Sequence, residues 1–305
     1  MTTTLERKRA RVSAGDMAYA EEGSGPAVVL LHGFPTSAHL WSDLVPLLAP
    51  RFRAIAPDLI GYGDSAKPPD ARLDVRAQAG YVRELLEQLG VSGFAAVGHD
   101  IGGGVAQLLA LEGGVHSLVL IDSTASGSPA RVEVIQPTDR SDVDAGFAEG
   151  YVRAHLERGM SRPKRLFQED LEEFVRPWRQ DPSALARAAR DVDGDHLGDT
   201  ATRLKALDIP SLVLWGEDDP YQPTELAERL WDLLPDASIA LLPGCSHYVM
   251  KDAAETVLPL ITQFLRKRYL GEEGHGHEHT AGPVAIDLGV SFERPPHPGD
   301  ELVDE

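Results

Sequence analysis

One short stretch of this 305-residue sequence carries most of its recognisable chemistry. The segment FAAVGHDIGGG, residues 94–104, has the pattern of an apolar strand that stops at Gly98-His99-Asp100 and continues as a glycine-rich helix. Such a sharp bend usually presents a serine hydroxyl at its apex, but here the apex residue is Asp100. A carboxylate with an ordinary pKa of about 4 is already ionised at neutral pH. We therefore expect Asp100 to be a nucleophile that attacks a saturated carbon directly and forms an alkyl ester.

Apolar runs that alternate with helical segments predict the secondary structure that positions Asp100. Their regular alternation implies a doubly wound, mostly parallel sheet with right-handed crossovers. Two short edge strands are expected first, and amphipathic helices are expected at 37–51, 75–90 and 253–269. The strands are predicted at 9–13, 16–23, 27–33, 52–59, 94–100, 117–122, 211–217 and 238–244.

One connection is far too long for an ordinary crossover. The residues between the strand ending at Asp122 and the strand beginning at Ser211 contain three segments of helical periodicity. We expect them to form an inserted helical lid over the carboxyl ends of the strands, where open α/β sheets bind ligands. The predicted organisation is a core of residues 1–127 and 206–270, a lid of residues 128–205, and an acidic, Gly/Pro-rich tail of residues 271–305.

Five segments together carry a specific family resemblance. The segments are LLHGFPTSAHLW, APDLIGYGDSAKP, VGHDIGGG, LVLWGEDDP and PGCSHYVMKD. Over about residues 9–269 they follow the order and approximate spacing found in α/β-hydrolase-fold enzymes, and the aspartate apex resembles the epoxide hydrolase and haloalkane dehalogenase branch. The resemblance implies a hydrolase-type sheet with a helical lid.

The matching positions imply a set of catalytic roles. The backbone N–H groups of Ile101 and Phe34 would form an oxyanion hole, in which each donor is expected to contribute about 3 kcal/mol. His247, in the loop beyond the last strand, would activate the water that hydrolyses the ester. Asp219 is the candidate that orients this histidine, and Asp122, at the end of the preceding strand, is the alternative acid. Asp218 is a weaker alternative.

The substrate is less sharply defined than the mechanism. Epoxide hydrolysis to a diol is favoured by HGFP and GHDIG, whereas PTSAHLW and DLIGYGDSAKP are similar to the dehalogenases. A haloalkane or haloacid dehalogenase is therefore the alternative, followed by an ester, lactone or C–C hydrolase and by a non-catalytic binding protein on the same fold. The lid residues that could assist the leaving group are Tyr151, His155, Trp178 and His196.

Composition excludes several other classes of function. The net charge of −19 disfavours a nucleic-acid partner, and no apolar run approaches the about 18 residues of a membrane span. The single Cys245 rules out an internal disulfide and fits a cytoplasmic enzyme. We expect a small electrophilic substrate, no cofactor and no metal, since the HGHEH run lies in a solvated tail. Whether the chain is a monomer or a homo-oligomer is left open.

Overall fold

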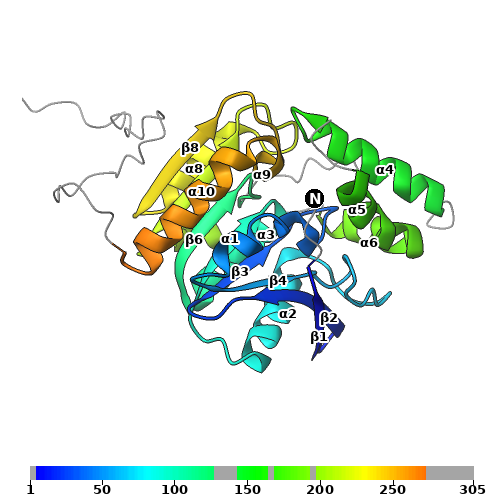
Figure 1. Cartoon of the computed structure of the whole chain (residues 1–305), viewed down its shortest axis with the longest axis horizontal. Helices are drawn as coiled ribbons and strands as arrows, with labels where there is room; N and C mark the ends of the chain where they lie inside the picture. The colour runs from blue at the N-terminus through cyan, green and yellow to red at the C-terminus, as the bar shows by residue number, and fades with distance from the viewer. Residues whose placement is uncertain (1–4, 127–142, 164–167, 193–196, 273–305) are drawn as a thin grey trace, which may run out of the picture.

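The computed structural model describes residues 5–126, 143–163, 168–192 and 197–272, and an eight-stranded sheet forms the centre of this part of the chain (Figure 1). The strand order is β1-β2-β4-β3-β5-β6-β7-β8. Strands β3 to β8 are parallel, and β1 and β2 form an antiparallel edge. This confirms the predicted fold class. The strands are β1 (Arg7–Val12), β2 (Gly15–Glu22), β3 (Ala27–Leu31), β4 (Arg53–Pro57), β5 (Phe94–His99), β6 (Val115–Ile121), β7 (Ser211–Gly216) and β8 (Ala237–Leu242).

The core helices pack in two groups. In one group α2 packs on α3, α3 on α7, and α7 on α8, while in the other α1 packs on α10. Strands β3, β5 and β7 are buried along their whole length, as expected of a sheet covered by helices. The helices are α1 (Val45–Leu48), α2 (Val75–Gln88), α3 (Ile101–Glu112), α7 (Thr200–Leu204), α8 (Thr224–Leu233), α9 (Val249–Asp252) and α10 (Ala254–Phe264), which continues into the turn η4 (Leu265–Tyr269).

The helix expected at 37–51 is wrong in one respect, because the segment is broken in two. A 3-10 turn, η1 (Ala38–Trp41), is followed by the short helix α1. Pro46 has no N–H to donate to the carbonyl four residues earlier, which disfavours a single helix through the segment. The turn is held instead by Asp58, whose Oδ1 accepts the N–H of Ala38 at 2.7 Å.

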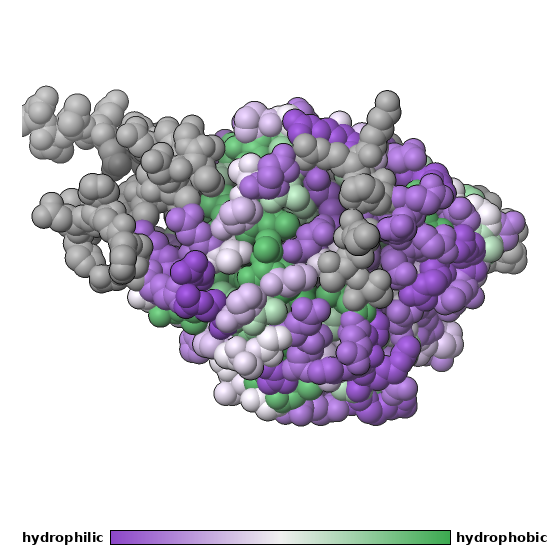
Figure 2. Space-filling view, viewed as in Figure 1, coloured by the Kyte–Doolittle hydropathy of each residue, from purple (hydrophilic) through white to green (hydrophobic). Residues whose placement is uncertain are grey.

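Three helices of the long connection form a group of their own. These helices, α4 (Ala145–Arg158), α5 (Gln168–Gln180) and α6 (Pro182–Val192), pack on one another and lie to one side of the sheet, away from α8 and α10 (Figure 1). The side of the molecule where they lie is largely hydrophilic in the same view (Figure 2). Three polar contacts fix α5 to the core: His39 Nε2 lies 2.7 Å from Asp170 Oδ1, and Arg176 Nη1 lies 2.9 Å from Asp64 Oδ1. In the third, the indole N–H of Trp178 donates to the carbonyl oxygen of Pro35.

Several sequence expectations fall partly outside the described residues. Residues 127–142 include the predicted start of the lid, and residues 273–305 include nearly all of the predicted tail with its HGHEH run. Within the four described ranges, no helix is long and apolar enough to cross a membrane.

Candidate active site

Asp100 occupies a sharp turn between β5 and α3. Its φ of 51° and ψ of −121° lie where side chains are rarely tolerated. The turn requires glycine on both sides, since a Cβ at Gly98 would collide with the carbonyl oxygen of Gly102, and a Cβ at Gly102 would collide with that of Leu31. This strained turn presents the carboxylate at the start of α3, and the side chain does not cap that helix.

The two carboxylate oxygens of Asp100 have different partners. Oδ2 accepts the backbone N–H of Phe34 at 2.9 Å, and the backbone N–H of Ile101 also bonds the carboxylate. Oδ1 accepts the side-chain amide of Gln222 at 3.2 Å. One oxygen therefore lies where the sequence predicts an oxyanion hole, and the other faces the loop after β7.

Burial changes the electrostatics expected for Asp100. The residue is only 6% exposed, and this burial raises the pKa of its carboxyl above the ordinary value. The charge of His247, the N–H groups of Phe34 and Ile101, and the amide of Gln222 all oppose the shift by favouring the carboxylate. The ordinary pKa expected from the sequence is therefore wrong, and the cause is the loss of water around the group.

His247 and Asp219 form a buried pair in the loops after β8 and β7. The distance from His247 Nδ1 to Asp219 Oδ2 is 2.8 Å, and both side chains are 1% exposed. Asp219 Oδ1 accepts the N–H groups of Tyr221 at 2.7 Å and Gln222 at 3.0 Å. A carboxylate beside Nδ1 requires the ring proton on that nitrogen, so Nε2 is left as the basic atom of the neutral ring.

The pKa of His247 reflects a competition between burial and charge. Burial lowers the pKa of the imidazole, but the charge of Asp219, its hydrogen bond and the charge of Asp100 outweigh this effect and raise the pKa. The ring also lies 4.5 Å from the ring of His99, whose Nε2 is 3.0 Å from the carbonyl oxygen of His247. His99 therefore fixes the backbone of the histidine loop.

Asp122, the alternative acid, is placed differently. It directly follows β6 with a φ of 43°, is fully buried, and accepts the N–H of Gly216 on Oδ1 at 2.8 Å. Its Oδ2 meets no N–H or O–H donor among the described residues, and Asp219 lies close enough to share a proton with it. Burial and the charge of Asp219 raise the pKa of Asp122 well above its ordinary value. The structure brings Asp219, and not Asp122, to His247; Asp218 holds Ser246 Oγ through its carbonyl oxygen.

The lid candidates gather around the ring of Phe34. The centroids of Tyr151, His155 and Trp178 lie 6.2, 5.6 and 6.4 Å from it. The indole N–H of Trp178 is already donated to the carbonyl oxygen of Pro35 at 2.7 Å. His196 lies outside the described residues.

His155 is held as a neutral ring. It stacks on Tyr221 with centroids 4.3 Å apart, and Tyr221 Oη donates to the carbonyl oxygen of His155 at 2.9 Å. Burial, together with the charges of His247 and Arg158, lowers the pKa of His155 to about 3. A ring that is neutral at physiological pH cannot act as the strong acid for a leaving group.

Sequence reasoning missed three residues at this site. Gln222 follows Asp219 by only three positions, and that proximity was the one signal that could have found it. Tyr248, next to His247, has its ring 4.9 Å from the histidine ring. Tyr62 lies in the loop after β4 with its ring 6.4 Å from that of Phe34. The hydroxyls of Tyr62 and Tyr248 are buried and have no hydrogen-bond partner in the described ranges.

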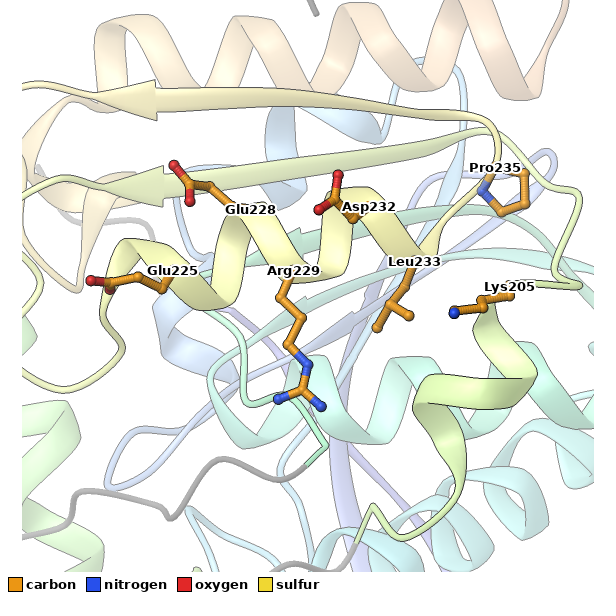
Figure 3. Close-up of a pocket in the computed structure, with 7 residues that line it drawn as sticks. All are labelled: Lys205, Glu225, Glu228, Arg229, Asp232, Leu233 and Pro235. Carbon is orange, nitrogen blue, oxygen red and sulfur yellow. The ribbon is translucent and has the colours of Figure 1, made fainter. Parts of the chain in front are cut away.

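A large surface pocket lies elsewhere. Its volume is about 670 Å³, and it lies along α8 and the end of α7 (Figure 3). Charged side chains dominate its lining, and none of them belongs to the cluster around Asp100. It is lined by Lys205, Glu225, Glu228, Arg229, Asp232, Leu233 and Pro235.

No metal site accompanies the cluster. Among the residues that the structure describes, no group of three or more His, Cys, Asp or Glu side chains is placed to hold a metal ion.

The fold is that of the α/β hydrolases. The chain belongs to the α/β hydrolase fold family, whose model matches residues 26–254, and it is an enzyme of the α/β-hydrolase class. Among solved structures, epoxide hydrolase CorEH has a TM-score of 0.74 and 26% identity, covering 86% of this chain and 99% of that one.

Relatives with a named activity include dehalogenases and an epoxide hydrolase. Haloalkane dehalogenase 2 of Mycobacterium tuberculosis is 27% identical over 272 residues, 82% of this chain and 92% of that protein. Fluoroacetate dehalogenase of a Burkholderia species is 30% identical over 283 residues, 80% of this chain and 88% of that protein. Soluble epoxide hydrolase of Corynebacterium sp. strain C12 is 44% identical over a shorter stretch of 106 residues, 35% of this chain and 37% of that protein.

Proposed function

We propose that the protein hydrolyses epoxides to diols through an alkyl ester on Asp100. The observation that carries this proposal is the placement of the Asp100 carboxylate at the apex of the turn, with Oδ2 on the N–H of Phe34 at 2.9 Å. A carboxylate held in this way already has one oxygen where negative charge must later be stabilised. The other oxygen, Oδ1, is the one that attacks.

The first step is a displacement at carbon. Oδ1 of Asp100 forms a bond to an epoxide carbon while the bond between that carbon and the ring oxygen breaks, and the departing oxygen takes a proton from a tyrosine. Asp100 attacks as the carboxylate; the charge of His247 and the donors on both oxygens favour this ionised form, although burial outweighs them and raises the pKa of the carboxyl.

The second step is hydrolysis of the ester. His247 Nε2 removes a proton from water, whose oxygen attacks Cγ of Asp100, and the resulting oxyanion on Oδ2 is held by the N–H groups of Phe34 and Ile101. The tetrahedral intermediate collapses, and the departing diol oxygen takes the proton from His247. The remaining proton of the attacking water returns to the tyrosinate, which leaves the enzyme in its starting state.

The available donors favour an epoxide over a halide. Tyr248 has a buried hydroxyl without a partner in the described ranges, and its ring contacts His247. Burial, followed by the charges of Tyr221 and Asp100, raises the pKa of Tyr248 well above its ordinary value, so the hydroxyl stays protonated and can donate. We assign it as the proton donor, with Tyr151 of α4 as the second hydroxyl.

A departing halide would find fewer donors. The indole N–H of Trp178 is occupied by Pro35, and the side chain of Ile101 carries no N–H. A haloalkane or haloacid dehalogenase nevertheless remains the second candidate, because two relatives matched over most of their length are dehalogenases. In this proposal α4, α5 and α6 serve as the lid in either case, since aromatic side chains of α4 and α5 meet Phe34 beside the nucleophile.

The two candidates are separated by paired assays. Diol formation from a styrene-type epoxide and halide release from a short haloalkane are measured on the same preparation, and we expect turnover of the epoxide. His247→Gln should then accumulate the alkyl ester, seen by mass spectrometry as added mass on the peptide that contains Asp100. His116→Gln, at an exposed histidine, is the matched control and should not trap it. Turnover without added mass in the His247 variant would contradict the ester mechanism.

A further inference from the structure

Gln222 connects the two halves of the candidate site. The residue is 3% exposed, and its backbone is held on both sides. The N–H of Gln222 donates to Asp219 Oδ1 at 3.0 Å, and its carbonyl oxygen accepts the indole N–H of Trp215 at 2.7 Å. These anchors direct its side-chain amide to Asp100 Oδ1, at 3.2 Å.

The amide creates a difference between two chemically equivalent oxygens. In an ionised carboxylate Oδ1 and Oδ2 are identical, so only their surroundings decide which one attacks. Oδ2 is bound by the N–H of Phe34, and Oδ1 is bound by Gln222. A half-turn of the carboxylate would exchange the oxygens, and it must break the hydrogen bonds on both sides.

We infer that Gln222 is a catalytic residue that keeps Oδ1 of Asp100 as the attacking oxygen. Its hydrogen bond prevents the carboxylate from rotating by half a turn between catalytic cycles. This role rests on the proposed ester mechanism and extends it to a residue other than Asp100, His247 and Asp219. The donor acts on the reacting atom itself, and it is placed by the same loop that supplies Asp219.

The consequence is a fixed route for each oxygen atom. When the ester is hydrolysed, Oδ1 leaves in the diol and the water oxygen takes its place, while Oδ2 stays in the oxyanion hole. Without a half-turn, Oδ2 is never exchanged, however many cycles follow. With a half-turn, the old Oδ2 becomes the attacking atom, and both carboxylate oxygens are eventually replaced by oxygen from water.

Turnover in oxygen-18 water shows which carboxylate oxygens of Asp100 are replaced by oxygen from water. The enzyme is allowed many turnovers of a styrene-type epoxide, then digested in ordinary water, and the peptide containing Asp100 is weighed. We expect one heavy oxygen in the wild type. Gln222→Met keeps the backbone anchors but removes the donor, and it should raise the doubly labelled fraction about tenfold at a matched number of turnovers, as expected for the loss of one hydrogen bond to a charged group.

Matched variants distinguish the loss of the Gln222 hydrogen bond to Asp100 from a general destabilisation of the protein. Gln78→Met removes another buried amide, whose partners are the backbone groups of Ile60 and Leu73, and it should leave the labelling single. Gln222→Asn is too short to reach Asp100 and repeats the test if the methionine variant is unstable.

The possible outcomes are distinct. Double labelling in the wild type, or single labelling in both Gln222 variants, would overturn the role of Gln222 while leaving the ester mechanism intact. An Asp100 peptide without any heavy oxygen after turnover would overturn the ester mechanism itself, and the role of Gln222 with it.

Discussion

The carboxyl groups of Asp122 and Asp219 lie against each other beyond the ends of the neighbouring parallel strands β6 and β7. Two adjacent buried carboxyls cannot both ionise without a large energetic cost. Burial and the charge of Asp219 raise the pKa of Asp122, whereas Asp219 faces His247 at 2.8 Å. We therefore predict that Asp122 is the protonated member of the pair and that its proton is directed toward Asp219, the candidate partner of His247.

Replacing Asp122 tests this assignment. The substitution Asp122→Asn keeps an acceptor for the N–H of Gly216 and a donor toward Asp219, and asparagine tolerates a positive φ. We expect the free energy of unfolding of this variant to stay within about 1 kcal/mol of the wild type, whereas Asp122→Leu should lose about 2–3 kcal/mol. Urea unfolding measures both, and equal midpoints for the two variants would contradict the assignment.

The sign of the pH dependence provides a second readout of the same pair. The folded-state pKa of Asp122 is raised above 3.8, so its contribution to stability is complete at lower pH and is lost as the pH rises toward the folded value. Asp122→Asn does not titrate. Its stability relative to the wild type should therefore improve as the pH increases.

Asp219→Asn should impair the second chemical step far more than the first. Without the carboxylate, His247 loses its preferred tautomer, and the hydrolysis of the ester should slow by about a thousandfold or more. Formation of the ester needs no base and should change much less. Stopped-flow and quench measurements of single turnovers resolve the two steps. Asp218→Asn, at the adjacent exposed position, is the control; an equal loss there would point to disruption of the loop.

The pH dependence of His247 should differ between the free enzyme and the ester. The pKa of the ring is raised above 6.5 in the free enzyme, in part by the charge of Asp100. Ester formation removes that charge, so the pKa should fall in the intermediate. Hydrolysis requires the neutral ring and should speed up as the pH rises, with a midpoint below the pKa titrated by NMR in the free enzyme. Asp100→Asn should lower that NMR value; no change would exclude the coupling.

Folding stability should follow the opposite direction. Because the folded-state pKa of His247 is raised, its contribution is fully present below the unfolded value of 6.5 and is lost as the pH rises through the folded value. Activity that depends on His247 therefore increases over the same interval in which its contribution to stability declines.

Tyr248→Phe separates a proton donor from a packing residue. Because the hydroxyl is buried without a partner in the described part of the chain, its removal should not lower the free energy of unfolding. Ester formation from an epoxide should nevertheless slow by about a hundredfold. Tyr62→Phe removes a second buried, unpartnered hydroxyl and should leave the rate within about threefold of the wild type. Similar losses in both variants would reject the assignment to Tyr248.

The sequence by itself was sufficient to predict the sharp turn at Asp100 and the mostly parallel sheet around it. The tight turn at Asp100 depends on close backbone approaches that only glycine permits at Gly98 and Gly102, and this requirement is visible in a few consecutive residues. Asp219 and His247 could be nominated because both follow predicted parallel strands, and the carboxyl ends of such strands meet at one edge of a sheet. The catalytic roles of these residues remain predictions.

Only the tertiary structure decided between groups that local patterns leave equivalent. Asp122 and Asp219 both follow buried strands, and the geometry of the histidine loop brings His247 to Asp219. The sequence could not show that the indole N–H of Trp178 is already donated to Pro35, because the two residues lie 143 positions apart. Gln222 reaches Asp100 because the loops after β5 and β7 converge across β6. Contacts of this kind depend on strand order and on the packing of distant loops, and the spacing of Gln222 from Asp219 gives no indication of its contact with Asp100.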